Sequence, residues 1–274
     1  MNFARELFSK RNRVLLKEMV KTDFKLRYQG SVLGILWSVI KPMALFLVMY
    51  VVFINFLRFG ATEPKASHFA MQLLLAMVIW QFFSETVMQG MMSIVSRGDL
   101  LRKINFPKVI VVISASVGAL ISFGINLVVV IVLSLINGVQ FNLSSVFAVF
   151  PFIELYFFAL GLALLLGALF VKFRDIAHIW EVAMQMFMYS VPIIWPLSMI
   201  IDHHLLITKI ILLNPLAQII QDARNLMIYS HATTTWGLIN NWFITIIPII
   251  ITVFMFLIGL FYFNKQSQKF AEEV

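Results

Sequence analysis

The sequence contains no cysteine and few charged residues. Of its 274 residues, 61% are hydrophobic and only 12% are charged. Without cysteine the chain can form neither disulfides nor thiolate metal sites. A mean hydropathy of +0.93 excludes an ordinary water-soluble domain. The shortage of charge therefore indicates a polytopic membrane protein.

Nucleotide-binding and processing motifs are missing as well. No G-x-x-x-x-G-K-[ST] pattern occurs, so any ATP that the protein uses is bound by another chain. Residues 1–27 lack the apolar core of a signal peptide, so membrane insertion is expected to rely on the first spanning helix. The net charge of +8 does not indicate nucleic acid, because the cations flank apolar runs instead of gathering on a polar face.

Six apolar runs are long enough to cross a bilayer, which takes roughly 20 helical residues. In the fourth run, Gly161 and Gly167 would let a neighbouring helix approach closely. The fifth run is interrupted near its outer end by Pro192 and Pro196. The sequence thus predicts an all-α membrane protein whose transmembrane domain covers 31–266, with spans at about 33–57, 69–92, 109–136, 146–171, 176–200 and 242–263.

The distribution of Lys and Arg predicts the orientation. Seventeen of the 21 lie on the side that carries both termini in a six-span arrangement. Because cations accumulate in cytoplasmic loops, both termini are expected in the cytoplasm, and 267–274 form a short cytoplasmic tail. The four cations that remain for the external side are Arg58, Lys65, Lys209 and Arg224.

Residues 1–30 are predicted to form an amphipathic helix that lies in the membrane interface. One face would carry apolar side chains, among them Leu15, Met19 and Leu26. Such a helix binds the surface of an anionic leaflet. Its opposite, basic face consists of Lys10, Arg13, Lys17, Lys21 and Lys25.

A charged segment, Ser96–Lys108, lies between the second and third spans and must reach one face of the membrane. Asp99–Ile104 can form a short helix with Asp99 as its N-cap. Its paired leucines, Leu100 and Leu101, beside Arg102 and Lys103 would fit the groove of a partner protein. An ordinary loop held at the lipid headgroups by its charges is the alternative.

The segment after the fifth span predicts a re-entrant hairpin on the outer face. Leu205–Leu213 is apolar but too short to cross the bilayer. A second helix would follow over 215–229, with Asn214 as N-cap and Pro215 at the first helical position. Backbone of this kind is stable in a membrane only where protein covers it.

Three carboxylates lie within or beside spans, where ionisable side chains are functional candidates by default. Glu181 is close enough to Arg174 for a cytoplasmic ion pair, whereas the roles of Glu85 and Glu154 stay open. His203 and His204 beside Asp202 could hold a metal, but adjacent histidines diverge on a helix and solvated loop side chains are the simpler interpretation. We therefore predict no metal site.

Several short motifs, each present once, follow one another in a specific order along almost the whole chain. They are Asp23–Gly34 with Trp37 and Lys41-Pro42, Asn105-Phe106-Pro107, Arg174-Asp175, Pro192-Ile193 and Asn214-Pro215. In this order the chain resembles the type-2 ABC transporter permeases that export polysaccharides. Within them it is most similar to the branch that exports lipid-linked wall polymers such as teichoic acids and rhamnose-containing polysaccharides. It departs from the family at Val191, where a serine is frequent, which puts the detail of the gate in doubt.

The resemblance implies a permease in the bacterial cytoplasmic membrane that moves a lipid-linked glycan outward. It implies a homodimer with two ABC ATPase subunits, which bind the ATP and Mg, so this chain needs no cofactor and is not itself an enzyme. Asn214 and Pro215 would belong to an external re-entrant gate. The charged segment would be the coupling helix, and its ATPase interface would comprise Asp99, Leu100, Leu101, Arg102, Lys103 and Phe106.

A glycan that passes between two subunits needs a path whose walls bind sugars weakly, and aromatic faces can do this by stacking. The candidate lining residues are Phe46 and Tyr50 on the first span and Phe187 and Tyr189 on the fifth. Trp37 and Trp195 are weaker candidates, because aromatic residues at span ends commonly form interfacial belts.

Two other classes of function stay open at this point. A membrane-embedded transferase acting on a lipid-linked sugar would need clustered carboxylates or a positioned histidine, and here the carboxylates are scattered. A secondary transporter usually shows an internal repeat, and none is apparent.

Overall fold

The structure, a computed structural model, describes residues 9–27, 29–58, 66–201, 204–239 and 241–273. Every regular element in these residues is helical. Asp202 and His203, which were considered with His204 as possible metal ligands, lie outside the described residues. The longest elements are α2 (Lys10–Arg27), α3 (Trp37–Met49), α4 (Ala66–Ser93), α6 (Val109–Ile136), α7 (Val149–Lys172), α8 (Ile176–Ser190), α11 (Pro215–Met227) and α14 (Ile247–Gln266).

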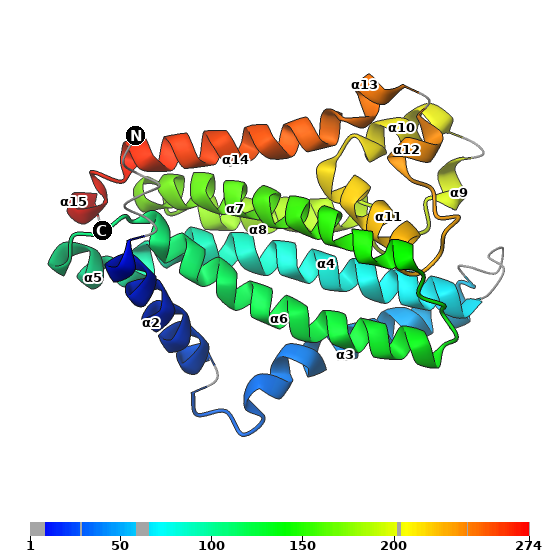
Figure 1. Ribbon diagram of the computed structural model, residues 1–274, viewed down its shortest axis with the longest axis horizontal. Helices are drawn as coiled ribbons and strands as arrows, with labels where there is room; N and C mark the ends of the chain where they lie inside the picture. Colours follow the sequence, from blue (N-terminus) through cyan, green and yellow to red (C-terminus); the bar gives the residue numbers. More distant parts are fainter. Residues whose placement is uncertain (1–8, 28, 59–65, 202–203, 240, 274) are drawn as a thin grey trace.

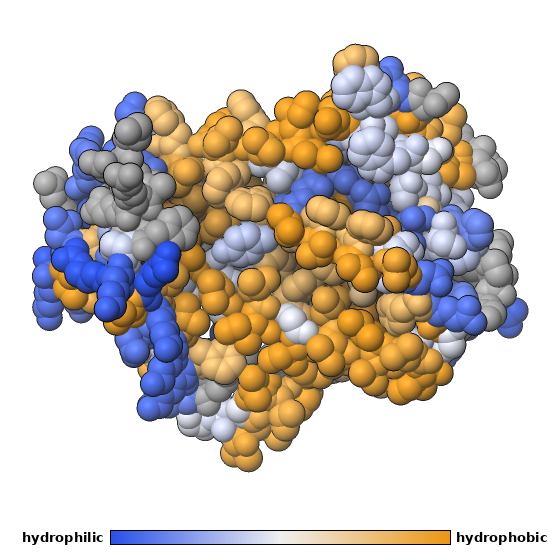
Figure 2. All heavy atoms as spheres, viewed as in Figure 1, coloured by the Kyte–Doolittle hydropathy of each residue, from blue (hydrophilic) through white to orange (hydrophobic). Residues whose placement is uncertain are grey.

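Short elements connect these helices at the two ends of an elongated bundle (Figure 1). One end carries η3 (Val95–Arg97), α5 (Gly98–Lys103) and α15 (Phe270–Glu273). The other end carries α9 (Ser198–Ile201), α10 (Leu205–Leu212), α12 (Thr235–Leu238) and α13 (Trp242–Thr245). Figure 2 shows an apolar surface across the middle, with hydrophilic residues gathered towards both ends, as a bilayer-spanning bundle requires.

Five helical segments of the described chain are long and apolar enough to cross a membrane. They agree closely with five of the six predicted spans, and in the first of them the helix continues from α3 into the π-helical turn η2 (Tyr50–Phe56). Helices α10 and α11, bent by 97° at their junction, would make a sixth segment if counted as one broken span. The five segments are Gly34–Phe56, His68–Ser93, Val109–Ile136, Leu143–Lys172 and Trp242–Gln266.

The predicted fifth span over 176–200 is helical only as far as Ser190. Val191 is extended, with φ −94° and ψ 141°, because the proline that follows it disfavours helical geometry and supplies no N–H donor. The 15 residues of α8 cover about 22 Å, less than a bilayer core of about 30 Å. After Ser190, Val191–Ile194 are buried and non-helical, and the chain is helical again only in the short, partly exposed α9.

Helix α4 is the centre of the core. Leu73, Leu74, Leu75 and Ile79 have no exposed surface, and α4 packs against both α6 and α7. The half of α4 around these residues is buried on all sides and apolar, whereas a polar stripe that includes Glu85 and Gln89 follows on one face of its second half.

Helices α7 and α14 approach closely at two glycines, as the sequence predicted for Gly161. A Cβ atom on Gly161 would lie 2.6 Å from the Cα of Phe256, and one on Gly259 would lie 2.1 Å from the Gly161 carbonyl oxygen. At Gly167 a Cβ would lie 3.4 Å from the Gly90 carbonyl oxygen, an ordinary contact distance, whereas one on Gly90 of α4 would lie only 2.7 Å from the Cβ of Ala163 on α7. Small side chains at these positions therefore set the spacing of the helices.

The N-terminal helix forms over Lys10–Arg27 and packs on α6. Its predicted basic face is exposed along its whole length, whereas Met19 is buried against the protein. Leu26, expected on the same apolar face, is 61% exposed. The helix thus covers the bundle with one part of its apolar surface, and its position in a membrane interface stays a prediction.

The residues after α14 are more than a charged tail. Phe270 of α15 is fully buried and its ring meets that of Phe263 edge-on, with centroids 5.1 Å apart. Lys108 Nζ donates a hydrogen bond to the carbonyl of Ser267. The end of the chain is therefore packed beside the charged segment.

Candidate functional site

Helix α5 is held on the bundle by apolar side chains of its own chain. Leu101 and Phe106 are 4% and 5% exposed and belong to a cluster with Met19, Val109 and Phe270. The prediction that Leu101 and Phe106 contact a partner protein is wrong, because both side chains are buried against α2, α6 and α15 of the same chain. The face left for a partner consists of Asp99, Arg102, Lys103 and Asn105, together with one apolar side chain, Ile104, which is 47% exposed.

The start of α5 also differs from the expectation. Gly98 is its first residue, Arg97 is the N-cap, and the Arg97 side chain makes no capping hydrogen bond. Asp99 therefore lies in the first turn, where its carboxylate still interacts favourably with the helix dipole.

An ion pair connects η3, the short turn between α4 and α5, to the N-terminal helix. The guanidinium of Arg97 pairs with the carboxylate of Asp23 on α2, and Ser114 Oγ on α6 donates to the same carboxylate over 2.8 Å. Burial lowers the pKa of Arg97 from its usual value, but the group stays charged because that value is far above neutrality. Three elements thus meet at one carboxylate.

A second polar cluster lies one helical turn further along α2. Arg27 donates to Glu85 and Gln89 on α4, and to Ser122 Oγ on α6 over 3.1 Å. Glu85, whose role the sequence left open, is therefore the counter-ion of Arg27. The expected pair of Arg174 with Glu181 is absent among the described residues, and Arg174 lies instead over the ring of Phe170, 5.3 Å from its centroid.

A cavity of about 760 Å³, called here the α3–α8 cavity, adjoins the second cluster. Two cations, Arg27 and Lys41, and two indole rings, Trp37 and Trp80, line it. Cations bind phosphate, and aromatic faces with amide groups suit sugar rings. The remaining polar lining consists of Ser38, Gln81, Ser84, Glu85, Gln89 and Ser122.

The four aromatic residues predicted to line a conduit do not line this cavity. Phe46 and Tyr50 lie together on the first span, with ring centroids 5.9 Å apart, and Tyr50 is 37% exposed. Phe187 packs partly against the core, whereas Tyr189 is 70% exposed. Their role as conduit lining stays a prediction. Trp195, the weaker candidate, donates its Nε1–H to the Tyr189 carbonyl over 3.1 Å.

The hairpin residues adopt the predicted local structure. Asn214 caps α11, its Oδ1 accepting from the backbone N–H of Leu216 over 3.0 Å, and Pro215 occupies the first turn. Their part in a gate is not tested by this geometry.

Arg224 on α11 is the functional residue that the sequence reading missed. We had placed it on the external side as one of four scattered cations, but it is 1% exposed. Its guanidinium donates to the carbonyls of Pro192, Ile193 and Gln72 over 2.8, 2.9 and 3.2 Å. It thus satisfies backbone acceptors that the non-helical end of the fifth segment leaves open. The available signal in the sequence was the pair Pro192 and Pro196, which interrupts the fifth apolar run and leaves carbonyls that need a donor such as an arginine.

Comparisons with known proteins agree on one kind of molecule. The family profile described as ABC-2 type transporter matches residues 14–228. A protein of Klebsiella pneumoniae named O-antigen export system permease protein RfbA is 27% identical over 260 residues, which cover 94% of each chain. A protein of the same name from Myxococcus xanthus is 32% identical over 204 residues, covering 74% of this chain and 75% of that one.

Proposed function

The chain belongs to the ABC-2 type transporter family, and from that premise we propose that it is the permease of an exporter for a lipid-linked cell-surface polysaccharide. The proposal rests on the relatives named as O-antigen export permeases and on the α3–α8 cavity. The polymer would be of the teichoic acid or rhamnose-rich wall type. No described feature favours the transferase or the secondary transporter considered above.

The α3–α8 cavity is the observation that carries this function. A lipid-linked saccharide combines anionic phosphate, sugar hydroxyls and a hydrocarbon chain. Lys41 can bind the phosphate, Trp37 and Trp80 can stack on sugar rings, and the cavity borders the exposed apolar surface of α3. The cavity thus offers all three kinds of contact.

Replacing Lys41 tests the assignment of the cavity. Lys41→Ala should reduce polymer at the cell surface about tenfold, the effect of losing one charge-assisted hydrogen bond of about 1.4 kcal/mol. Lys265→Ala removes an equally exposed cation at the end of α14 and should export normally. Normal export by Lys41→Ala at wild-type protein levels would contradict the assignment.

ATP would be hydrolysed by partner subunits bound at the charged segment. The chain has no phosphate-binding loop, and the exposed face of α5 offers Arg102, Lys103 and Asp99 for polar contacts. The purified chain should therefore hydrolyse no ATP, and ATPase subunits should restore hydrolysis. Arg102→Glu should weaken their co-purification, whereas Lys265→Glu should not. Hydrolysis by the pure chain that persists through repeated purification counts against the proposal.

The permease would act as a homodimer with the α5 end in the cytoplasm. Helices α3 and α8 expose apolar side chains such as Leu47 and Val182, which a second copy could cover around a shared path. Single cysteines at 140 and 231 should then react with an impermeant reagent outside the cell, and those at 98, 173 and 268 only after lysis. Labelling of position 98 on intact cells would reverse the orientation.

In this orientation α10 and α11 form an external re-entrant gate. Both helices lie at the end opposite α5, which favours a loop that returns to its own side over a crossing (Figure 1). Asn214 and Pro215 form the sharp junction between them.

A further inference from the structure

A second cavity, called here the α7–α14 cavity, lies between α7, α11 and α14 towards the end opposite α5. Its volume is about 730 Å³, within the range of small-molecule sites. Figure 2 shows hydrophilic residues recessed between the apolar surfaces of α7 and α14. Among its apolar walls, Phe150 and Val253 are 64% and 51% exposed, so the cavity opens sideways on the apolar belt of the molecule. Its other apolar wall residues include Phe147, Ile153, Phe157 and Phe256.

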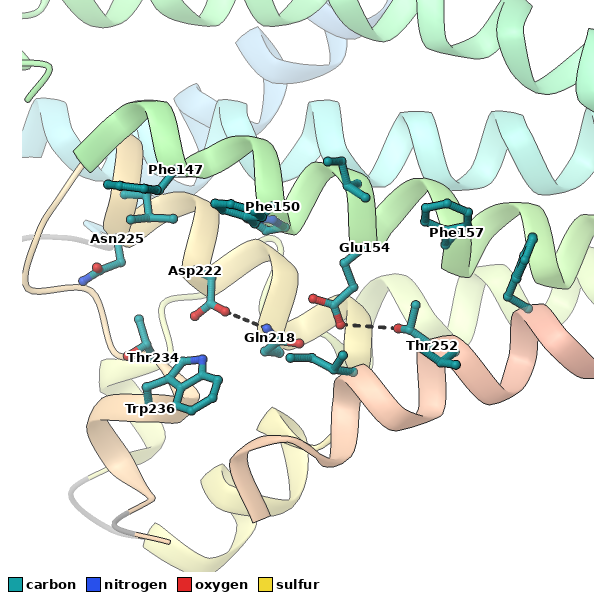
Figure 3. Close-up of a pocket in the computed structure, with 16 residues that line it drawn as sticks. Phe147, Phe150, Glu154, Phe157, Gln218, Asp222, Asn225, Thr234, Trp236 and Thr252 are labelled. Atoms are coloured by element: carbon teal, nitrogen blue, oxygen red, sulfur yellow. Dashed lines mark hydrogen bonds between the residues drawn. The ribbon is translucent and has the colours of Figure 1, made fainter. Parts of the chain in front are cut away.

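The floor of this cavity is polar and comes from three helices (Figure 3). Thr252 Oγ1 on α14 donates to Glu154 Oε1 on α7 over 3.4 Å, and Gln218 Nε2 donates to Asp222 Oδ2 on α11 over 2.6 Å. Gln218 is 2% exposed, and its Oε1 has no hydrogen-bond partner among the described residues. The floor therefore presents more acceptors than the protein supplies with donors.

No cation of the protein compensates the two carboxylates. The residues that line the cavity include no Lys, Arg or His. Arg224, two positions after Asp222 on α11, is directed instead at the carbonyls of Pro192, Ile193 and Gln72. Because uncompensated carboxylates in apolar surroundings are costly, the floor suits a ligand that brings positive charge and several N–H donors.

We propose that the α7–α14 cavity binds a membrane lipid with a primary-amine headgroup. The ammonium would donate to Glu154, Asp222 and the free Oε1 of Gln218. The hydrocarbon chains would lie along the phenylalanines of the wall and leave through the lateral opening into the bilayer. The hydroxyl of Thr234 and the indole of Trp236 also line the cavity. They lie beside Asp222 and can receive the phosphate of the same headgroup (Figure 3).

Other ligands fit the same cavity less well. The diphosphate of a lipid-linked glycan would meet two carboxylates and no cation, so this is not a site for the exported polymer. A hydrated metal ion would leave the aromatic walls unused, and the described residues contain no group of three or more metal-ligating His, Asp or Glu. The amine-bearing lipid uses both the charge and the apolar wall.

Lipid binding should stabilise the protein, because a ligand that binds only the folded state raises its melting temperature. We expect dioleoyl phosphatidylethanolamine, added to the purified full-length chain in detergent, to raise the melting temperature by several degrees. Dioleoyl phosphatidylcholine is the matched probe, because its headgroup has the same charge but no N–H donor. Native mass spectrometry should show at least tenfold more bound phosphatidylethanolamine than phosphatidylcholine. Equal effects of the two lipids would overturn the proposal.

Substitutions in the floor of the cavity test whether the preference for phosphatidylethanolamine arises there. Glu154→Gln with Asp222→Asn should abolish the preference for phosphatidylethanolamine, whereas Asp175→Asn, an exposed acid at the α5 end, should retain it. If the double variant does not fold, Thr252→Val and Gln218→Leu provide single changes that each should reduce the preference at least threefold. Retention of the full preference in every folded variant of the floor would overturn the site.

The hydrocarbon chain is tested separately. Phosphoethanolamine without chains should leave the melting temperature unchanged, because the apolar wall then contributes nothing. Stabilisation by this soluble probe would show that the cavity binds a free amine and would overturn its assignment to a lipid. None of these measurements depends on polymer export.

Discussion

The two ends of the bundle differ in the partners of their charged side chains. At the α5 end two half-buried cations meet carboxylates, Arg97 with Asp23 and Arg27 with Glu85. At the hairpin end Arg224 donates to three backbone carbonyls, and Asp222 meets no cation among the residues that line its cavity. The first end uses charge to join helices, whereas the second uses it to complete irregular backbone and leaves two carboxylates without a cation among the residues that line their cavity.

This contrast has a physical cause. Helices α2, α4 and α6 satisfy their own backbone, so only side chains remain to be paired between them. Residues 191–194 are non-helical and buried, so their carbonyls need donors from elsewhere. A guanidinium with five N–H groups in a plane can supply several of these donors from one side chain.

The largest effect on stability is expected at Arg224. Arg224→Leu would leave the carbonyls of Pro192 and Ile193 without donors, at a cost of about 2–6 kcal/mol, since each unsatisfied buried acceptor costs about 1–3 kcal/mol. We expect little folded protein in the membrane, measured by detergent extraction and size-exclusion chromatography. Arg224→Lys keeps the charge but not the planar set of donors and should be intermediate. A wild-type melting temperature for Arg224→Leu would remove the contrast between the two ends.

A smaller loss is expected from the apolar contacts that hold α5. Leu101→Ala should destabilise the protein by about 2–3 kcal/mol, because it opens a cavity in the cluster with Met19 and Phe270. Leu100→Ala is the matched control, since Leu100 is only partly buried and should lose less. Thermal unfolding in detergent separates the two variants. Equal, negligible effects would restore the view that a partner protein buries Leu101.

The polar cluster at the end of α2 should contribute less again. In a double-mutant cycle, Arg27→Gln and Glu85→Gln should show a coupling of about 1 kcal/mol, because both side chains are partly exposed and water weakens their attraction. The cycle is measured by thermal unfolding at low and high salt, and the coupling should shrink in high salt. A coupling near zero at low salt would mean that α2 is held by apolar packing alone.

The smallest effect on stability is expected at the exposed aromatic residues. Tyr50→Leu and Tyr189→Leu should change stability by less than about 0.5 kcal/mol, since neither ring is buried. If they line the polymer path, export should fall while ATP hydrolysis and dimer assembly persist. Trp242→Leu, at an exposed position on α13, serves as a control for an interfacial aromatic residue. Full export in the double tyrosine variant would reject an aromatic path through these spans.

Local signals in the sequence were reliable where few residues decide the structure. Asn214 and Pro215 predicted the start of α11, and Gly161 predicted the close approach of a neighbouring helix, because each depends on one or two side chains. The predicted capping of α5 by Asp99 was wrong, since the chain entering from η3 starts the helix two residues earlier, with Arg97 as the N-cap.

The pairing of charged residues could not be predicted from spacing along the chain. Arg174 and Glu181 are close in sequence but do not pair, whereas Arg27 and Glu85 are 58 residues apart and do. The distribution of cations predicted only that Arg224 lies on the external side of the membrane, and not that it is buried. Its actual environment depends on where the chain after Ser190 runs, which no local pattern contains.

The sequence alone determined that this is an all-α, membrane-spanning chain, because apolar runs of bilayer length in a chain with 12% charge permit little else. Only the tertiary structure decided which charges meet, which face of α5 stays exposed and where cavities form. These features arise where three or more helices converge, and the geometry of such a convergence is set by packing across the whole bundle.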